Sequence, residues 1–125
     1  MRSLRLTNTF QIGWIFSIVV NKKSRLGVKV LDLDKKYVDF IKATVLSEVP
    51  NAEIFVFGSR TQGNALKYSD VDIALKCEQK IPIVTILMLR AKFSDSTFPY
   101  KVDIVDLNDL KPEFKKIIEK DLYRI

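Results

Sequence analysis

The pattern of apolar residues predicts helices in three stretches of the chain. In the first, which runs to about Val49, they follow one another every three or four positions, as in a helix with one buried side. Asp32 or Asp34 can cap the start of this helix. Two later stretches, residues 81–93 and 110–122, are apolar enough for helices that pack on a sheet, and each has a proline near its start.

Three shorter stretches predict β-strands. Residues 54–57, 71–75 and 101–107 are rich in apolar and β-branched side chains and have the length of strands. The resulting order of elements is helix, strand, strand, helix, strand, helix. This order predicts a single small α/β domain in which helices cover a short mixed β-sheet.

Residues 1–27 depart from this pattern. Two arginines precede an apolar run over 10–20, and a basic cluster follows at 21–25. A basic start and a short apolar core are typical of a signal peptide, but no small-x-small cleavage site follows, and the run is too short to span a bilayer. Three interpretations stay open: a poorly ordered or wrongly assigned extension, an added strand or helix, and export. We expect the folded domain to comprise residues 28–125, with 1–27 as an atypical leader outside it.

Composition restricts the chemistry that this domain can perform. The 125 residues include no histidine and one cysteine, Cys77. Triads and zinc sites that need histidine are therefore excluded, as is a disulfide within the chain. Acid–base or metal chemistry must rest on carboxylates, lysine, tyrosine or hydroxyl groups. The 21 basic and 15 acidic residues give a net charge of +6, which suits an anionic ligand such as a nucleotide, a nucleic acid or an acidic partner.

A glycine–serine turn follows the first predicted strand. Gly58 permits a tight turn and lets the backbone come close to a ligand. Where such a turn leads into a helix, its backbone N–H groups can bind a phosphate. Ser59 adds a hydroxyl donor, and Arg60 can add a charge-assisted contact to the same anion. The turn is therefore a candidate phosphate-binding site.

Aspartates on the next two predicted strands form the second part of the pattern. Asp70 and Asp72 are two residues apart, so both carboxylates point to the same face of a strand. Adjacent carboxylates repel unless a cation lies between them, and Mg²⁺ commonly binds one or two carboxylates together with substrate phosphates. Asp103 and Asp106 are three residues apart, so only one of them can face this pair. We choose Asp103, because a carboxylate in mid-strand is costly without a partner, whereas Asp106 can cap the next turn.

These residues resemble the DNA polymerase β nucleotidyltransferase superfamily. Gly58-Ser59, ten intervening residues, Asp70-x-Asp72 and a later strand with Asp103 follow its pattern. The short chain and the strand around Asp103 are similar to the minimal nucleotidyltransferase (MNT) group, and the resemblance extends over about 31–125. It implies that the three aspartates bind two catalytic Mg²⁺ ions and that Asp103 helps to activate the attacking hydroxyl.

The resemblance also implies how the nucleotide is held. The glycine–serine turn of the family holds nucleotide phosphates, which here assigns Gly58 and Ser59 to a nucleoside triphosphate, with ATP as the expected substrate. Arg60 and Ser69 match further residues of the motif. The expected reaction is in-line attack of a hydroxyl on the α-phosphate.

The resemblance implies a partner as well. Many MNT proteins are antitoxins paired with a HEPN-family RNase toxin, and some silence the toxin by adenylylating a tyrosine. The expected function is therefore an antitoxin that transfers AMP from ATP to its HEPN partner. One alternative is an antitoxin that only masks its partner, and another is a transferase for a small molecule such as an aminoglycoside. We expect a cytoplasmic protein, with no direct binding to nucleic acid and no membrane contact.

Overall fold

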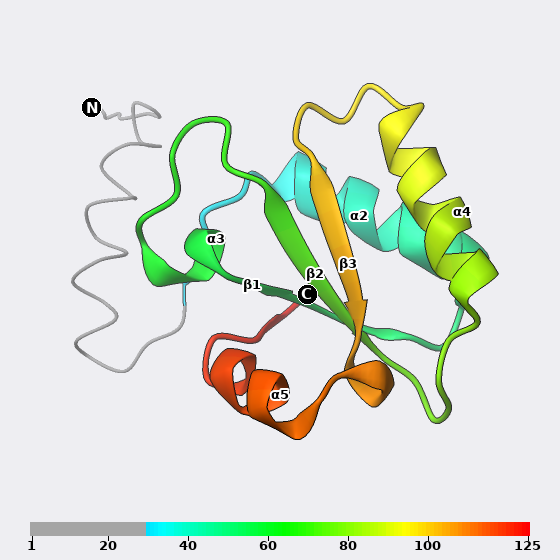
Figure 1. Cartoon of the computed structure of the whole chain (residues 1–125). Helices are drawn as coiled ribbons and strands as arrows, with labels where there is room; N and C mark the ends of the chain where they lie inside the picture. Colours follow the sequence, from blue (N-terminus) through cyan, green and yellow to red (C-terminus); the bar gives the residue numbers. More distant parts are fainter. Residues whose placement is uncertain (1–29) are drawn as a thin grey trace.

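The computed structural model describes residues 30–125 (Figure 1). The leader 1–27, and the predicted start of the domain at residue 28, lie outside the described residues. Eight helices and strands and one 3₁₀ helix follow in the order α2 (Lys35–Glu48), β1 (Glu53–Phe57), α3 (Ser59–Gln62), β2 (Val71–Lys76), α4 (Ile83–Ser94), β3 (Val102–Asp106), 3₁₀ helix η1 (Leu107–Asp109), α5 (Pro112–Glu119) and β4 (Tyr123–Arg124).

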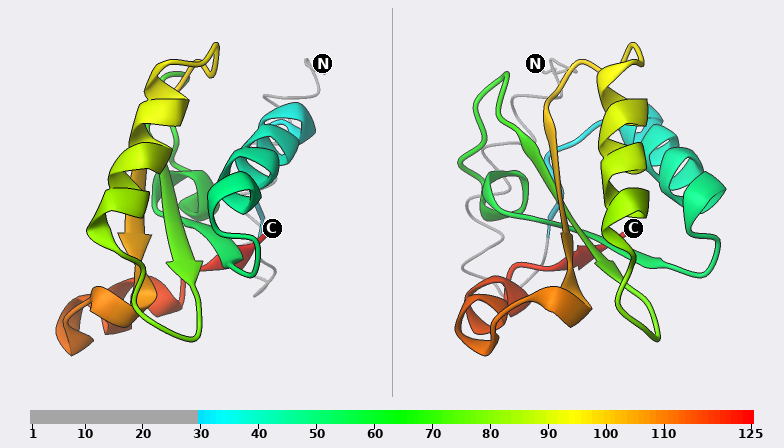
Figure 2. Two further views of the ribbon diagram at one scale, coloured as in Figure 1. Left: turned by 90° about the vertical axis from the view of Figure 1, so that its right-hand side faces the viewer. Right: turned by 45° about the vertical axis from the view of Figure 1, so that its right-hand side comes forward.

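The strands form one mixed sheet in the order β3-β2-β1-β4. β1 runs antiparallel to both β2 and β4, whereas β2 and β3 run parallel. In this register Phe57 of β1 pairs with Asp72 of β2, and Asp72 pairs with Asp103 of β3. The mixed sheet with helices packed on it confirms the predicted fold class (Figures 1 and 2).

The main core lies between one face of the sheet and the helices α2 and α4. Because strand side chains alternate, every second residue of β2, from Val71 to Leu75, points to this face. Helix α2 contributes Ile41 and Val45, and α4 contributes Leu89, all of them fully buried. This core ties together the parts of the chain that flank the glycine–serine turn and the aspartates.

The opposite face of the sheet is covered over only part of its length. There Phe57 and Ala74 pack with Leu107 of η1 and Ile118 of α5, and Val105 of β3 packs against this cluster. Figure 1 shows η1 and α5 at the end of the sheet where β2 and β3 finish. The starts of β2 and β3, which include Asp72 and Asp103, lie on the same face away from α5.

Three details of the predicted elements were wrong, each for a local reason. The loop after Gly58 contains the one-turn helix α3, and one turn is too short to leave a periodic pattern. The last predicted helix ends at Glu119, and the two-residue strand β4 follows and pairs with β1. The third strand is shorter than 101–107, because Leu107 already belongs to η1.

The predicted cap of the first helix can be compared with the structure. Asp34 occupies the capping position of α2, but its side chain makes no capping hydrogen bond; its carbonyl accepts from the backbone N–H groups of Tyr37 and Val38. Cys77 is half-buried just after β2 and packs against the main core, and burial raises the pKa of its thiol. No helix among residues 30–125 combines the length and apolar character needed to cross a membrane.

Candidate active site

The turn between β1 and α3 requires a glycine for two reasons. Gly58 has φ of +82° and ψ of −150°, a backbone conformation that other residues rarely adopt. In addition, a Cβ at this position would collide with the carboxylate of Asp72. The backbone of the turn and the Asp72 carboxylate are therefore in direct contact, so a ligand bound by one would also meet the other.

Local hydrogen bonds hold the turn in place. The carbonyl of Gly58 accepts from the backbone N–H of Thr61 at 3.0 Å and from the Thr61 hydroxyl at 3.0 Å. Ser59 is the first residue of α3 and is half-buried. The predicted phosphate-binding turn is thus a defined loop at the end of β1, directly beside the second aspartate of the motif.

Asp72 and Asp103 lie side by side on the two parallel strands. They occupy paired positions of β2 and β3, and both are half-buried, whereas Asp70 is exposed just before β2 begins. Burial raises the pKa of the Asp72 carboxyl, and the negative charges of Asp103 and Asp70 raise it further. The structure therefore brings the three predicted aspartates together closely enough for their charges to interact.

The chemistry of these groups fits a divalent cation such as Mg²⁺. Carboxylate oxygens are the hard donors that Mg²⁺ prefers, and a cation would relieve the repulsion acting on Asp72. Within residues 30–125, no group of three or more acidic, cysteine or histidine side chains is spaced as a complete ligand set. The arrangement suits a site in which a few carboxylates share the ion with substrate phosphates, the usual mode for Mg²⁺.

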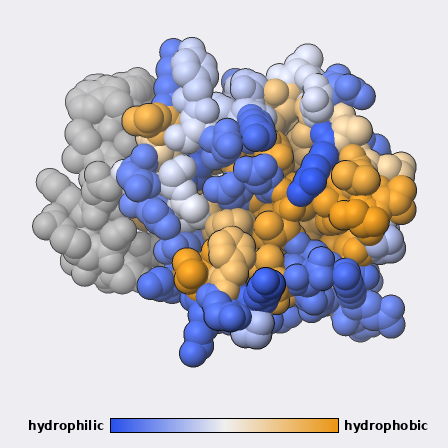
Figure 3. Space-filling view, viewed as in Figure 1, coloured by the Kyte–Doolittle hydropathy of each residue, from blue (hydrophilic) through white to orange (hydrophobic). Residues whose placement is uncertain are grey.

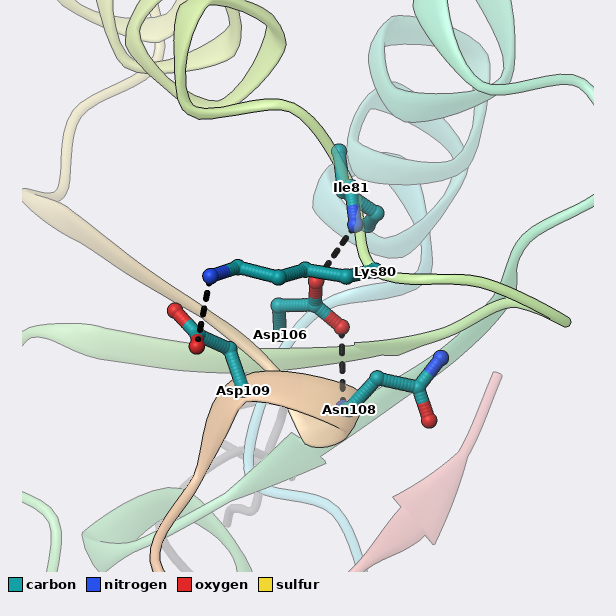
Figure 4. Close-up of polar contacts among 5 residues, drawn as sticks. All are labelled: Lys80, Ile81, Asp106, Asn108 and Asp109. Carbon is teal, nitrogen blue, oxygen red and sulfur yellow. Dashed lines mark hydrogen bonds and ion pairs between the residues drawn. The ribbon is translucent and has the colours of Figure 1, made fainter.

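Asp106 instead binds backbone groups at the other end of β3, as Figure 4 shows. Its carboxylate accepts hydrogen bonds from the backbone N–H of Ile81 at 2.6 Å and of Asn108 at 2.9 Å. The side chain is buried on the side of the sheet away from Asp103 and joins β3 to the start of η1 and to the segment before α4. The predicted assignment of Asp106 to a turn cap is confirmed.

Arg60 lies beneath the loop, with its guanidinium directed at protein groups. It is only 5% exposed, and its guanidinium donates to the carbonyl of Asp32 at 3.1 Å and to that of Ser69 at 2.8 Å. It also lies over the ring of Tyr100 at 4.2 Å. In this structure Arg60 therefore holds the loop that leads to the aspartates, and its predicted contact with a phosphate stays a prediction.

Ser69 shapes the approach to Asp70. Its hydroxyl accepts from the backbone N–H of Leu66 at 2.7 Å, and its own N–H donates to the carbonyl of Leu66 at 3.0 Å. These bonds close a turn immediately before Asp70. Like Arg60, Ser69 stabilises the loop that leads to the aspartates. A direct contact between Ser69 and the nucleotide stays a prediction.

A cleft beside Asp103 was missed by the sequence reasoning. It has a volume of about 640 Å³ and lies between the end of α4 and β3. Its lining includes Arg90, Phe93, Tyr100, Lys101 and Asp103. These residues come from a helix, a loop and an edge strand, so no spacing along the chain could have indicated that they meet.

Comparisons with known proteins show the family to which the chain belongs. The polymerase beta nucleotidyltransferase family model matches residues 41–124. Among curated proteins, the chain is 33% identical over 90 residues to a probable protein adenylyltransferase, MntA, from Haemophilus influenzae. That match covers 72% of this chain and 79% of the relative.

Two solved structures share the fold. One is a toxin–antitoxin crystal structure with AMP-PNP, which is 24% identical, has a TM-score of 0.58 and matches over 67% of this chain and 68% of that chain. The other is a tri-AMPylated Shewanella oneidensis HEPN toxin in complex with MNT antitoxin, with 22% identity, a TM-score of 0.55 and coverage of 69% and 66%. Because the family model matches more than half of its length, the chain belongs to the polymerase beta nucleotidyltransferase family and is a nucleotidyltransferase.

Proposed function

We propose that this nucleotidyltransferase is an antitoxin that uses Mg²⁺ and ATP to transfer AMP to a tyrosine hydroxyl of a HEPN-family toxin. The observation that supports it best is the pairing of Asp72 with Asp103 beside the Gly58 turn. The similarity to the Haemophilus influenzae adenylyltransferase and to toxin–antitoxin structures agrees with this assignment. The toxin and its antitoxin would meet in the cytoplasm, which suits a half-buried free thiol.

Each site residue has a role in this reaction. Gly58 and Ser59 hold the phosphates of ATP, while Asp70, Asp72 and Asp103 bind two Mg²⁺ ions. Bound by these carboxylates, the ions would supply charge stabilisation to the reacting phosphate. Asp103 accepts the proton of the tyrosine hydroxyl while the tyrosine oxygen forms its bond to the α-phosphorus. The bond from the α-phosphorus to the β-phosphate oxygen breaks, and pyrophosphate leaves.

A masking antitoxin without catalysis is the second candidate. Exposed apolar side chains on α4 would serve a protein that only covers its partner. Asp72 is nevertheless retained beside Asp103 and Asp70 although their charges raise its pKa, and such a cluster is costly unless it has a function. The catalytic reading is therefore the better supported one. Transfer to an antibiotic has no comparable observation in its favour.

Mass spectrometry of the partner tests the proposal. The full chain is incubated with ATP, Mg²⁺ and a purified candidate HEPN-family toxin, and the toxin should become heavier by one or more AMP units. Asp72→Asn should abolish the increase, whereas Asp109→Asn, which removes the same charge from an exposed site on η1, should not. An unmodified partner that both variants inhibit equally well would favour masking instead.

A further inference from the structure

Helix α4 is apolar on both of its sides. Ile86, Leu89 and Phe93 on its inner side are buried in the main core. The outer face of α4, defined here as Ile83, Val84, Leu87 and Met88, is 69%, 58%, 52% and 47% exposed. Figure 3 shows apolar residues gathered on this side of the molecule. A helix that is apolar all round is typically buried, and clustered exposed apolar side chains mark an interaction site.

The outer face leads directly to the cleft beside Asp103. Ile83, Leu87, Arg90 and Ser94 follow one another at intervals of four, three and four residues, so they lie along one line of the helix surface. The first two are apolar and exposed, and the last two line the cleft that also includes Asp103. A partner lying along this line would be apolar at one end and would reach the aspartates at the other.

The size of the surface favours a partner that also occupies the cleft. A stable interface needs about 800 Å² from each partner, more than four partly exposed side chains supply. The adjoining cleft provides the additional surface, and Arg90 and Lys101 give its rim positive charge. The arrangement fits a partner with an apolar segment followed by acidic residues and a hydroxyl.

We infer that the acceptor protein docks along the outer face of α4 and presents its hydroxyl through the cleft to Asp103. This inference rests on the proposed function for the identity of the partner. The apolar segment of the acceptor packs on Ile83 and Leu87, and acidic residues meet Arg90 and Lys101. Docking of this kind positions the acceptor hydroxyl before reaction, which lowers the barrier to transfer.

The test compares matched substitutions on two helices of the full chain. Ile83→Glu with Leu87→Glu removes the apolar line on α4, and Ile83→Ser with Leu87→Ser does so without added charge. Phe114→Glu with Ile117→Glu changes two exposed apolar residues of α5, which are 42% and 61% exposed, and serves as the control. Three quantities are measured for each variant: binding to a purified candidate HEPN-family toxin, binding of a fluorescent ATP analogue, and thermal unfolding.

Both α4 variants should bind the partner roughly thirtyfold more weakly or worse, the effect of losing a central apolar anchor. They should bind the ATP analogue and unfold like the wild type, and the KM for the acceptor should rise while the KM for ATP does not. The α5 variant should match the wild type. Unchanged partner binding by the α4 variants, or an equal loss in the α5 variant, overturns the inference.

A photo-crosslinker at position 87 identifies what covers the outer face. Crosslinks to the HEPN-family protein support the inference, whereas crosslinks to residues 1–29 or to a second copy overturn it. A wild-type complex without AMP transfer refutes the enzymatic function but leaves the docking result valid. Equal AMP transfer by the wild type and the α4 variants refutes docking on α4 but leaves the enzymatic function valid. The absence of any complex overturns both the docking inference and the proposed function.

Discussion

The two ends of one sheet face differ although their backbone geometry is the same. Asp72 and Asp103 are paired on β2 and β3, and two residues further along the same face Ala74 and Val105 are paired in the same way. Ala74 is fully buried in the cluster that includes Ile118 of α5, whereas Asp72 is half-buried. The strands thus provide equivalent positions, and the cover of α5 makes one end core and leaves the other for a ligand.

At the end of the sheet face that includes Asp72 and Asp103, removal of one negative charge should reduce catalysis. Asn at position 70, 72 or 103 keeps the shape of the side chain but removes one negative charge from the proposed metal site. AMP transfer should fall by roughly two to four decades, equivalent to the several kcal/mol that a metal contributes to the transition state. Transfer rates with saturating ATP and Mg²⁺ measure this loss. Near-parental transfer by Asp72→Asn would remove the assignment of this end as the active site.

At the end of the sheet face that α5 covers, introduction of an acidic side chain should lower the stability of the fold. Ala74→Asp puts a carboxylate against α5, where no cation is expected, and should cost about 3–5 kcal/mol of unfolding free energy. Lys76→Asp changes an exposed residue on the same face of β2 and serves as the control. Urea unfolding monitored by circular dichroism compares the two. Equal stability of both variants would mean that α5 does not distinguish the two ends.

A substitution at Gly58 should lower both the stability of the fold and the affinity for nucleotide. Gly58→Ala places a Cβ against Asp72 at a φ of +82° and should cost about 1–3 kcal/mol of stability together with nucleotide binding. Gly63→Ala is a matched control, since Gly63 has φ of +79° and ψ of 12° in the more accessible left-handed region. Thermal unfolding and titration of an ATP analogue test the pair. If Gly63→Ala proved the more damaging, the contact between Gly58 and Asp72 would not be important.

The smallest expected effect concerns the stability of the metal-free protein. Burial and the charges of Asp103 and Asp70 raise the pKa of Asp72, so the folded state loses stability as pH rises from the unfolded pKa through the folded one. Asp72→Asn should therefore unfold at a higher temperature than the wild type at pH 7 in the presence of a chelator. The difference should vanish below about pH 4, where both side chains are neutral. If Asp72→Asn were less stable than the wild type at pH 7, repulsion between Asp72 and the neighbouring carboxylates would be contradicted.

Net charge was a weaker guide than the motif. The excess of +6 suggested an anionic ligand, yet all fifteen acidic residues and fifteen of the 21 basic ones lie within residues 30–125. The part of the chain that forms the candidate site is therefore neutral, and the whole excess belongs to residues 1–29. Local arrangement of charge, such as Arg90 and Lys101 beside Asp103, is what a ligand would meet.

The sequence by itself determined the elements that rest on local geometry. The two-residue period of a strand separated Asp103 from Asp106, and the structure confirms that Asp106 is used as a cap. The same period predicted that Asp70 and Asp72 share a strand face, but β2 begins at Val71, so Asp70 lies just before the strand. Gly58 was predicted to form a tight turn because glycine adopts dihedral angles that other residues rarely do, and its φ of +82° agrees with this. These features depend on bonds and dihedral angles within a few residues, which the order of amino acids encodes directly.

The tertiary structure alone decided what each face meets. Arg60 was expected at the ligand, but Asp32, Ser69 and Tyr100 come together around it from distant segments and bury it. Helix α4 has apolar residues on both sides, and its sequence pattern does not tell which side packs on the sheet. Periodicity reports that residues share a face; which face is covered depends on packing between elements far apart in the chain.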